Sequence, residues 1–396
     1  MAFRIPKFTP PNFELSFLAD APEIVLEEVK KDGVAPRDFF LTSHMPTYYH
    51  HNGEWLLPKH NTHHSVAVLE ENEIIIKEFN DLLIGDKVVM GKSSDASNGV
   101  YVYKDGFGDK VIMKEGTAVE TSFSGAYNFL FDLMKNERDN GGYIVWVLGP
   151  SVVFDHDTRI GLSELAENGY VQGLLAGNAM ATHDLEGGYL DTALGQNIYT
   201  QESMPMGHYN HLDLLNEVRR TGSTDDFIAQ GHVKNGFMKT LSKLKIPYVL
   251  CGSIRDDGPL PEVYHNVTDG LRAVREQTDK ATLIICLATM LHSVSTAHIA
   301  SSYRLDDKGE VRPVYMYSVD VTENVVNKVA NARENIATRT LVTNVQDFVV
   351  NVQKALLEPV PNFEVEKQEL ENEIYEESKS EKTIENEKTI NLEEDR

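Results

Sequence analysis

Apolar runs alternate with segments of helical spacing throughout residues 143–357, and this alternation constrains the fold more than any other feature. The apolar runs cover residues 143–148, 170–175, 247–251, 282–287, 314–319 and 340–342. The helical segments cover residues 159–168, 210–221, 224–244, 267–277, 322–333 and 346–357. Continuous apolar strands separated by helices are typical of a parallel sheet that is covered on both faces. The sequence therefore predicts an α/β domain with a mostly parallel sheet in residues 139–358.

Residues 31–138 have a different rhythm, because short runs of β-forming residues alternate there with Gly, Asn and Asp. The runs cover residues 53–58, 63–70, 72–79, 86–92, 98–104 and 109–116. Such spacing predicts a smaller β-rich domain that precedes the sheet domain. Residues 125–135 have the apolar spacing of a helix. The proline-bearing residues 1–30 are predicted to form an irregular arm.

Charge and composition restrict the partners that we expect. The 396 residues carry a formal net charge of -24, whereas a nucleic-acid partner requires a basic face. Residues 361–396 hold 13 acidic and 5 basic residues with few core-forming side chains, which predicts a disordered acidic tail. With no visible secretory signal and no apolar run of membrane-spanning length, we expect a cytoplasmic protein without a membrane partner. Two cysteines, Cys251 and Cys286, exclude a disulfide framework.

Polar side chains gather where four of the predicted strands end. They lie at Asn178-Ala179, in residues 251–262, in residues 288–292 and at Asp320. Because the carboxyl ends of parallel strands meet at one edge of a sheet, ligands bind there. Structural loops do not need to concentrate Asn, Arg, Asp and His, so the convergence favours a ligand site. The glycine fingerprint G-x-G-x-x-G is absent from this domain, whose first strand ends in Gly149-Pro150.

Taken singly, several of these residues also have a structural interpretation. Asp320 suits the ribose hydroxyls of a dinucleotide, but it equally suits the N-terminus of the following helix. Arg255 can bind a carboxylate through two hydrogen bonds. Asp256 and Asp257 are adjacent acids, so one can pair with a cation while the other titrates at a shifted pKa. The same Asp-Gly-Pro segment is also typical of a surface turn.

Two further groups of polar residues raise the question of chemistry. His183 and Asp184 follow the apolar run 170–175 within a short span, after the small residues Ala176 and Gly177. Six of the 14 histidines also lie close together in the first domain: His44, His50, His51, His60, His63 and His64. Imidazole is a common metal ligand, but no helical H-x-x-x-H pair and no cysteine accompany these histidines. We interpret them as surface or cleft-lining residues and predict no metal site.

Five long segments of the chain resemble a known family. They are residues 141–155, 169–186, 207–223, 249–263 and 287–294, and the resemblance extends over about residues 31–356. The chain is similar to the conserved region named after the lysine-oxoglutarate reductase/saccharopine dehydrogenase of plants. Archaeal ornithine cyclodeaminases and the C-terminal part of cyanobacterial arginine dihydrolases belong to that family. The resemblance implies a β-rich domain followed by a Rossmann-like NAD-binding domain.

The resemblance also implies an activity and a site. The activity is conversion of L-ornithine to L-proline and ammonia, through an imine formed by transient hydride transfer to NAD+. The implied NAD contacts are Asn178, Ala179, Asp257, Thr289, Met290, Leu291, His292, Asp320, Thr343, Asn344 and Val345. For the substrate carboxylate we expect Arg255 or Arg220. Proton transfer, or binding of the δ-ammonium, is expected of His183, Asp184 or Asp256.

The chain departs from the family pattern at residues 62–64, at residues 117–127 and at Thr343-Asn344-Val345-Gln346, where the family commonly reads T-D-V-G. The departure at residues 62–64 bears on the identity of the substrate, because we expect the first domain to form one wall of the substrate-binding cleft. Two rival functions therefore stay open: another NAD-dependent amino-acid dehydrogenase of imine chemistry, and a non-catalytic NAD- or amino-acid-binding regulator. Whether the chain is an ornithine cyclodeaminase or an amino-acid dehydrogenase, we expect a small-molecule substrate and a homo-oligomer.

Overall fold

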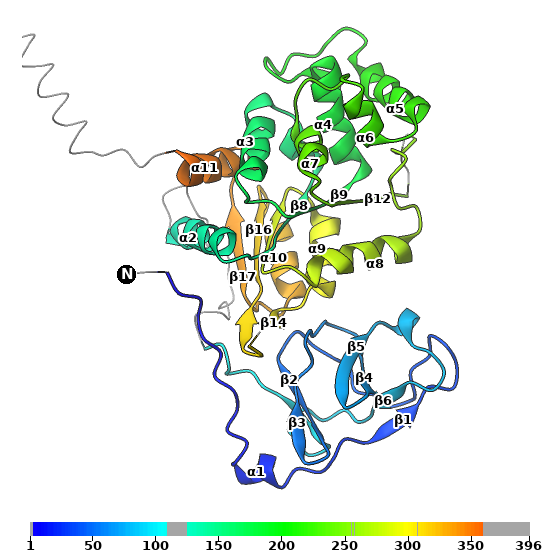
Figure 1. Cartoon of the computed structure of the whole chain (residues 1–396), viewed down its shortest axis with the longest axis vertical. Helices are drawn as coiled ribbons and strands as arrows, with labels where there is room; N and C mark the ends of the chain where they lie inside the picture. The colour runs from blue at the N-terminus through cyan, green and yellow to red at the C-terminus, as the bar shows by residue number, and fades with distance from the viewer. Residues whose placement is uncertain (1–2, 109–124, 255, 257, 307, 359–396) are drawn as a thin grey trace, which may run out of the picture. The chain divides into compact units, whose positions relative to one another are not determined.

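The computed structural model describes residues 3–108, 125–254, 256, 258–306 and 308–358 (Figure 1). Residues 1–356 form one compact unit, and residues 357–396 are a second unit of which only residues 357 and 358 are described. The predicted run 109–116 and the predicted acidic tail lie outside the described residues. Arg255 and Asp257 lie outside them as well.

A six-stranded parallel sheet forms the centre of the larger domain. Its strands are β8 (Ile144–Leu148), β9 (Gly173–Gly177), β12 (Tyr248–Cys251), β13 (Leu283–Leu287), β16 (Tyr315–Asp320) and β17 (Thr338–Val342). Their order is β12-β9-β8-β13-β16-β17, so numbering the strands along the chain gives 3-2-1-4-5-6. Every residue of β8 and β13 is buried, as expected for wholly apolar strands covered on both faces. The predicted α/β fold is confirmed.

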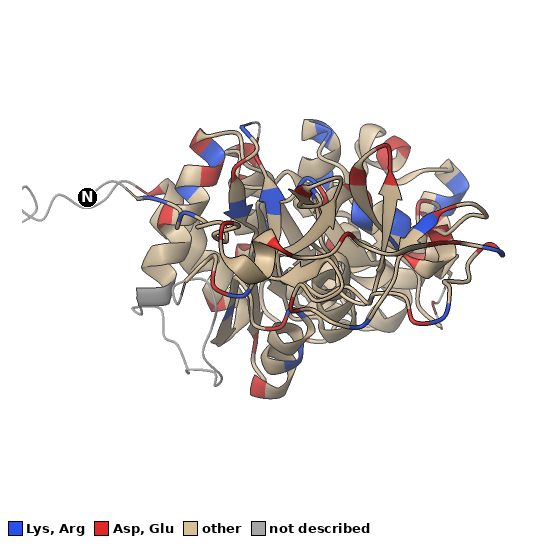
Figure 2. Cartoon of the chain, turned by 90° about the horizontal axis from the view of Figure 1, so that it is seen from below, with Lys and Arg blue, Asp and Glu red and all other residues tan. Residues whose placement is uncertain are grey.

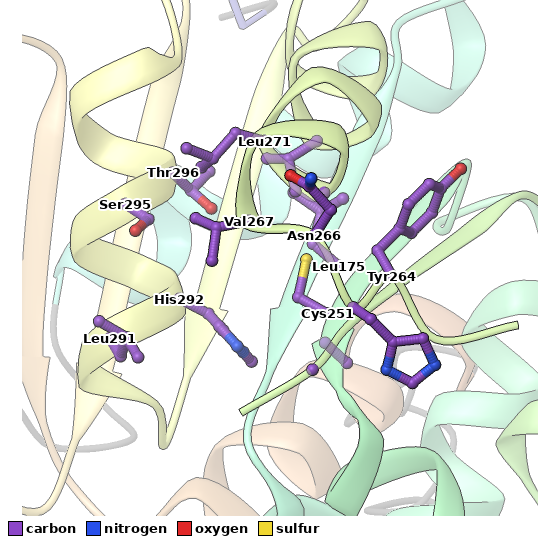
Figure 3. Close-up of a pocket in the computed structure, with 15 residues that line it drawn as sticks. Leu175, Cys251, Tyr264, Asn266, Val267, Leu271, Leu291, His292, Ser295 and Thr296 are labelled. Carbon is purple, nitrogen blue, oxygen red and sulfur yellow. The ribbon is translucent and has the colours of Figure 1, made fainter. Parts of the chain in front are cut away.

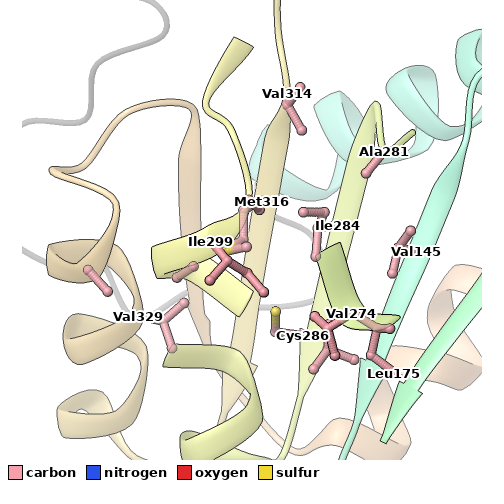
Figure 4. Close-up of a cluster of buried hydrophobic side chains, with 14 of the residues drawn as sticks. Val145, Leu175, Val274, Ala281, Ile284, Cys286, Ile299, Val314, Met316 and Val329 are labelled. Carbon is pink, nitrogen blue, oxygen red and sulfur yellow. The ribbon is translucent and has the colours of Figure 1, made fainter. Parts of the chain in front are cut away.

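Helices cover both faces of this sheet. On one face α8 (Val267–Thr278), α9 (Met290–Ile299) and α10 (Glu323–Ala332) share an apolar core with the strands (Figure 4). On the other face α2 (Gly125–Asp139) places Phe129 against Tyr315 of β16, with ring centroids 5.3 Å apart. In α2, Tyr127 also contacts Phe348 of α11 (Val345–Leu357). Alternate residues of each strand thus point to opposite layers.

The carboxyl edge of the sheet, where the parallel strands end, has a close crossing of two loops at the point where the strand order reverses. The N–H of Gly149, after β8, donates to the carbonyl oxygen of Leu287 at the end of β13 (2.9 Å). A Cβ at Gly149 would lie 1.9 Å from the carbonyl oxygen of Ala288, which itself has a left-handed φ of 51°. Only glycine therefore fits between these strands at the usual ligand crevice of such a sheet.

The predicted β-rich region contains two antiparallel sheets. One has the order β1-β6-β4-β5 and the other the order β3-β2-β7. Their strands are β1 (Leu26–Glu28), β2 (Thr47–His51), β3 (Glu54–Leu56), β4 (Val66–Glu70), β5 (Glu73–Lys77), β6 (Lys87–Val89) and β7 (Val100–Val102). Strand β2 was not predicted, because its TYYHH sequence combines aromatic residues with two histidines.

The β-rich region packs on the amino edge of the parallel sheet, opposite the carboxyl edge. Nε2 of the buried His44 lies 3.0 Å from the carbonyl oxygen of Ala332, at the end of α10. The backbone N–H of His44 donates to Glu334, and Tyr303 Oη donates to the carbonyl oxygen of Pro58. These contacts fix the first domain to the ends of helices that return from the carboxyl edge. The described part of that domain therefore lies away from the ligand crevice.

Several helices differ from the prediction. Helix α4 (Asn178–Leu190) begins directly after β9, and α9 begins directly after the loop of β13; neither was predicted. The predicted helix over 224–244 is divided into α6 (Thr224–Ala229) and α7 (Phe237–Leu244). Gly231 and Gly236 lie in the interruption with φ values of 83° and 128°, which a continuous helix does not allow. A further hairpin, β14 (Tyr303–Leu305) with β15 (Val311–Pro313), precedes β16.

Charged side chains of both signs are interspersed over the described chain (Figure 2). Acidic residues are therefore mixed with basic residues over the described chain. Among the described helices, none is long and apolar enough to span a membrane.

Candidate functional site

A cavity of about 470 Å³ opens at the carboxyl edge of the sheet, between the ends of β8, β9, β12 and β13. Its lining includes the following predicted site residues: Asn178, Ala179, His183, Asp256, Thr289, Leu291 and His292. Every described residue of the lining lies between Leu148 and His292. The expectation that the first domain forms one wall is therefore not met by its described residues.

Two helix N-termini face this cavity. Helix α4 has Gly177 as its N-cap and α9 has Thr289, and neither residue makes a side-chain capping bond. Backbone N–H groups of the first turn are thus left for an anionic group, which the helix dipole also favours. Asn178 accepts the N–H of Leu260 at 3.0 Å, so its side chain holds the loop after β12 beside the first turn of α4. The arrangement suits a phosphate or a carboxylate.

His183 enters the cavity from the second turn of α4 and is held from behind by a buried acid. Its Nδ1 lies 2.8 Å from Oε2 of Glu186, one helical turn further along α4. Glu186 is fully buried and His183 is 6% exposed. The edge of the Phe154 ring packs against the imidazole at a centroid distance of 5.6 Å. A histidine fixed through one nitrogen, with its other nitrogen available, can transfer a proton.

Burial favours the neutral form of two further ionisable groups of the lining, Cys251 and His292. Burial raises the pKa of the Cys251 thiol, so the side chain stays protonated and does not act as a thiolate nucleophile. Burial lowers the pKa of His292, which favours its neutral form. Among the described residues of the lining, Asp256 is the one carboxylate. Its Oδ2 accepts the N–H of Ser253 at 2.7 Å. Asp256 is therefore suited to bind a substrate cation.

Asp184 lies elsewhere, although it adjoins His183 in the sequence. Its Oδ1 pairs with Nε of the buried Arg159 at 2.8 Å. Its two oxygens also accept the N–H groups of Phe237 and Met238, at the start of α7. Asp184 is fully buried and is absent from the described lining of the cavity. Its carboxylate joins α3 (His156–Glu167), α4 and α7, so its position supports a structural role.

Other predicted residues lie at the same edge but outside the described lining. Asp320 ends β16, and its Oδ1 accepts the N–H and the hydroxyl of Thr322 at 2.9 and 2.8 Å. Asn344 accepts the N–H of Gln346 at the start of α11, and Val345 is buried. Met290 is 44% exposed on the first turn of α9.

Arg220 does not reach the cavity either. It is an exposed residue of α5 (Asn210–Thr221) and pairs with Glu217 at 3.0 Å. Its neighbour Arg219 lies nearer, because a Cβ at Gly258 would be 2.9 Å from Arg219 Nη1. The side chain of Arg219 therefore lies beside the loop that carries Asp256.

A second cavity of about 180 Å³ adjoins the first and shares Cys251, Leu291 and His292 with it. It lies between α8 and α9, and its wall is mostly apolar, with Val267 and Leu271 on the α8 side (Figure 3). His292 from α9 and Cys251 from β12 project into it (Figure 3). The two cavities together offer polar groups beside an apolar recess, as is common in small-molecule sites.

His44, His63 and His64 of the histidine-rich segment lie at the boundary between the β-rich region and the sheet domain, whereas the two histidines of β2 contact residues of the first domain. The His63 ring lies tilted against that of His64 at a centroid distance of 3.7 Å and stacks with His298 of α9 at 5.7 Å. Desolvation lowers the pKa of His63 and of His298. Within the described residues, no group of three or more His, Cys, Asp or Glu side chains is arranged to hold a metal ion.

Two residues of the site were missed by sequence reasoning. Glu186 holds His183, and His211 of α5 lines the cavity with its ring centroid 6.0 Å from that of His183. The spacing H-x-x-E over residues 183–186 places both side chains on one face of a helix. The H-x-x-E spacing therefore indicates a pair of neighbouring side chains only if residues 178–190 are already known to form a helix.

Strand order, crossover helices and a polar crevice at the reversal point together define a Rossmann-type nucleotide-binding domain. A family model of the Rossmann fold at the C-terminus of ArgZ-like arginine dihydrolases matches residues 130–352. The ornithine cyclodeaminase of Methanocaldococcus jannaschii is 33% identical over 320 residues, which cover 78% of this chain and 73% of that protein. The chain belongs to the family of archaeal ornithine cyclodeaminases and the C-terminal region of ArgZ-like arginine dihydrolases.

Solved structures are similar in fold as well. A LOR/SDH protein from Methanococcus maripaludis S2 superposes with a TM-score of 0.74 at 28% identity, over 85% of this chain and 98% of that one. The ternary complex of AgrE with ornithine and NAD+ gives a TM-score of 0.52 at 28% identity. It aligns with 85% of this chain but only 46% of AgrE, a bifunctional arginine dihydrolase/ornithine cyclodeaminase in Nostoc.

Proposed function

We propose that this chain is an NAD-dependent ornithine cyclodeaminase that converts L-ornithine to L-proline and ammonia. The observation that carries the proposal is the meeting of two uncapped helix N-termini, a carboxyl-held histidine and a carboxylate in one cavity. Membership of the ornithine cyclodeaminase family supports it, as does the binding of ornithine and NAD+ by the related AgrE.

The residues at the carboxyl edge fit a dinucleotide. In the β13–α9–β16 unit, a strand leads to an uncapped helix N-terminus, and the next strand ends in the acid Asp320. Such a unit binds the pyrophosphate at the helix and the ribose hydroxyls at the acid. One oxygen of Asp320 bonds Thr322, which leaves Oδ2 for a ribose. We therefore assign the dinucleotide to α9 and Asp320.

The other proposed NAD contacts are those that the family resemblance implies. They are Asn178, Ala179, Asp257, Met290, Leu291, His292, Asn344 and Val345, together with Thr289. With the ribose and pyrophosphate at β16 and α9, residues at the ends of β8 and β9, which line the cavity, would be left to surround the reactive end of the cofactor. When bound there, NAD+ supplies a hydride acceptor and, at the end of the reaction, a hydride donor.

The chain itself binds the diamino acid and moves its protons. Asp256 is suited to hold the substrate ammonium, and the first turn of α4 is suited to its carboxylate. Arg255, outside the described residues, is retained as a further carboxylate ligand. Nε2 of His183 accepts the proton of the α-ammonium and later protonates the leaving amine. Ring closure by the δ-amine releases one ammonia, and return of the hydride to the ring carbon leaves the overall reaction without net oxidation.

An assay with L-ornithine and a catalytic amount of NAD+ tests the proposal. We expect proline and ammonia to form in equal amounts, with no net NADH, because the hydride returns to the same molecule. Proline is measured by amino-acid chromatography, ammonia by a coupled enzyme assay and NADH by absorbance. Net NADH would instead identify a dehydrogenase. Tight NAD+ binding without turnover of any diamino acid would contradict both enzymatic functions.

Replacing Asp320 by Ala tests the cofactor placement. Loss of a charge-assisted hydrogen bond to a ribose hydroxyl is expected to raise the Kd for NAD+ about 10- to 100-fold. Isothermal titration calorimetry measures this Kd directly.

Asp306→Ala is the matched control for that substitution. Asp306 also accepts two backbone N–H groups, at 2.9 and 2.8 Å, but it lies in the β14–β15 hairpin at the amino edge. We expect this variant to bind NAD+ as the wild type does. Equal affinities in the two variants would remove Asp320 from the site.

A further inference from the structure

Glu186 is buried behind His183 and makes contacts that go beyond those of an ordinary core residue. We infer that Glu186 is a positioning residue for the reaction, which holds His183 in the tautomer that leaves Nε2 for the substrate. The inference rests on the proposed function, because it assigns the proton transfer to His183. Its structural basis is the set of hydrogen-bond donors around the carboxylate of Glu186.

The direction of every hydrogen bond to Glu186 can be assigned. Thr192 Oγ1 accepts a hydrogen bond from Asn210 Nδ2 at 2.8 Å, so its own proton goes to Glu186 Oε1 at 2.7 Å. The backbone N–H of Gly195 also donates to Oε1, at 3.1 Å. The N–H of Leu194 is shared between Oε2 at 3.2 Å and Nδ1 of His183 at 3.3 Å, with the shorter distance to the carboxylate. Oε1 of Glu186 thus receives two protons from groups that cannot reverse their role, and Oε2 shares a third.

These donors determine which of the two side chains, Glu186 or His183, carries the proton that lies between them. Two hydrogen bonds donated to Oε1 and a shared one to Oε2 form a surrounding that a carboxylate, as an acceptor of hydrogen bonds, satisfies. The remaining contact, Nδ1 to Oε2 at 2.8 Å, then requires a proton on Nδ1. The neutral imidazole has a single N–H, so its Nε2 carries the lone pair. His183 therefore presents a proton acceptor rather than a donor when substrate binds.

The ring has little freedom to leave this orientation. Phe154 packs edge-on against it, with an angle of 82° between the ring planes. Glu186 and His183 are separated by three residues on α4, so the helix itself maintains their separation. A proton acceptor that is fixed before substrate binds needs no reorganisation during the reaction.

Glu186 also connects His183 to the wall of the cavity. Leu194 and Gly195 form the turn between β10 (Thr192–Ala193) and β11 (Gln196–Asn197). Leu194 lines the cavity and has a left-handed φ of 51°. Its N–H is fixed by Glu186, so the same carboxylate sets both the tautomer of His183 and the position of this turn. Because it acts on two parts of the site, Glu186 affects catalysis without contacting substrate.

The substitution Glu186→Gln tests the inference, because the amide keeps the shape but replaces one oxygen by an N–H donor. The new N–H group then faces a donor, and at Nδ1 of His183 this conflict is removed if the imidazole changes its tautomer. We expect kcat with ornithine to fall by about 10²-fold while KM changes less than about threefold, since proton transfer is impaired and binding is not. The ¹⁵N NMR signals of histidine-labelled protein, assigned through His183→Gln, are expected to show a protonated Nδ1 in the wild type and a protonated Nε2 in the variant.

Thr192→Val provides a milder variant if Glu186→Gln folds poorly, because it removes one neutral donor and keeps the carboxylate. We expect it to keep the wild-type tautomer and to lower kcat less than Glu186→Gln does. Glu217→Gln, on the exposed face of α5, is the matched control and should leave kcat and the tautomer unchanged.

The two readouts separate this inference from the proposed function. An unprotonated Nδ1 in the wild type, or an unchanged tautomer and kcat in Glu186→Gln, overturns the positioning role. A wild type that does not convert ornithine overturns the proposed function, and in that case the tautomer in wild type and variant still decides whether Glu186 positions His183.

Discussion

Replacing Asp184 by Asn is expected to destabilise the protein by about 3–5 kcal/mol, because it leaves the buried guanidinium of Arg159 without its counter-charge. Arg159 and Asp184 are both fully buried and lie 2.8 Å apart. The new amide group would also direct an N–H toward a donor, either Arg159 or the N–H of Met238. Equilibrium unfolding in urea measures the loss of free energy of unfolding.

The control for this prediction is Asp191→Asn. Asp191 pairs with Lys234 at 2.6 Å, but both side chains are substantially exposed to solvent. Its left-handed φ of 59° suits Asn as well as Asp, so the backbone is not strained. We expect no resolvable change in stability. If the two variants unfold at the same urea concentration, the buried pair is not a structural element, and a functional role for Asp184 must be reconsidered.

This pair also shows what the sequence conceals. Asp184 adjoins His183, and both were predicted to handle protons. On α4, however, adjacent residues point in directions about 100° apart, so His183 faces the cavity while Asp184 faces α3 and α7. The partner Arg159 lies 25 residues away in the sequence, and nothing local indicates the pairing.

The parallel sheet was predictable for a simple physical reason. Strands such as β8 and β13 are buried on both faces and therefore consist of uninterrupted apolar residues. The same burial concealed α4, since ten of its thirteen residues are buried and no polar face remains to reveal the helical period. Helix α9 is short and similarly apolar, and its first turn was read only as a strand end.

The candidate site was predictable only in part. The residues at the ends of β9, β12 and β13 converge because parallel strands end at one edge, and Asn178, Thr289 and Asp256 line one cavity there. Glu186 was not found, since its spacing from His183 has a meaning only on a helix. The placement of the first domain depends on long-range contacts such as that of His44 with Ala332, which no local pattern indicates.

Replacing His183 by Gln is expected to lower kcat for ornithine cyclodeamination by about 10²- to 10⁴-fold, the usual contribution of a proton-transfer group. Gln can still donate a hydrogen bond to Glu186 from the same helical position, so the fold and the β10–β11 turn should be preserved. The affinity for NAD+ should be unchanged, because the dinucleotide is assigned to α9 and Asp320. Steady-state kinetics and calorimetric titration with NAD+ measure these two quantities.

Added imidazole sharpens this prediction, because it can occupy the space vacated by the ring and restore a proton acceptor. We expect imidazole to increase the turnover of His183→Gln in proportion to its concentration and to leave the wild type unaffected. His208→Gln is the control, since His208 is an exposed residue immediately before α5 and does not line the described cavity. Turnover of His183→Gln within about threefold of wild type would exclude His183 as the proton-transfer group, because loss of such a group lowers turnover far more than that. Asp256 would then be the remaining described carboxylate of the cavity that can accept the proton.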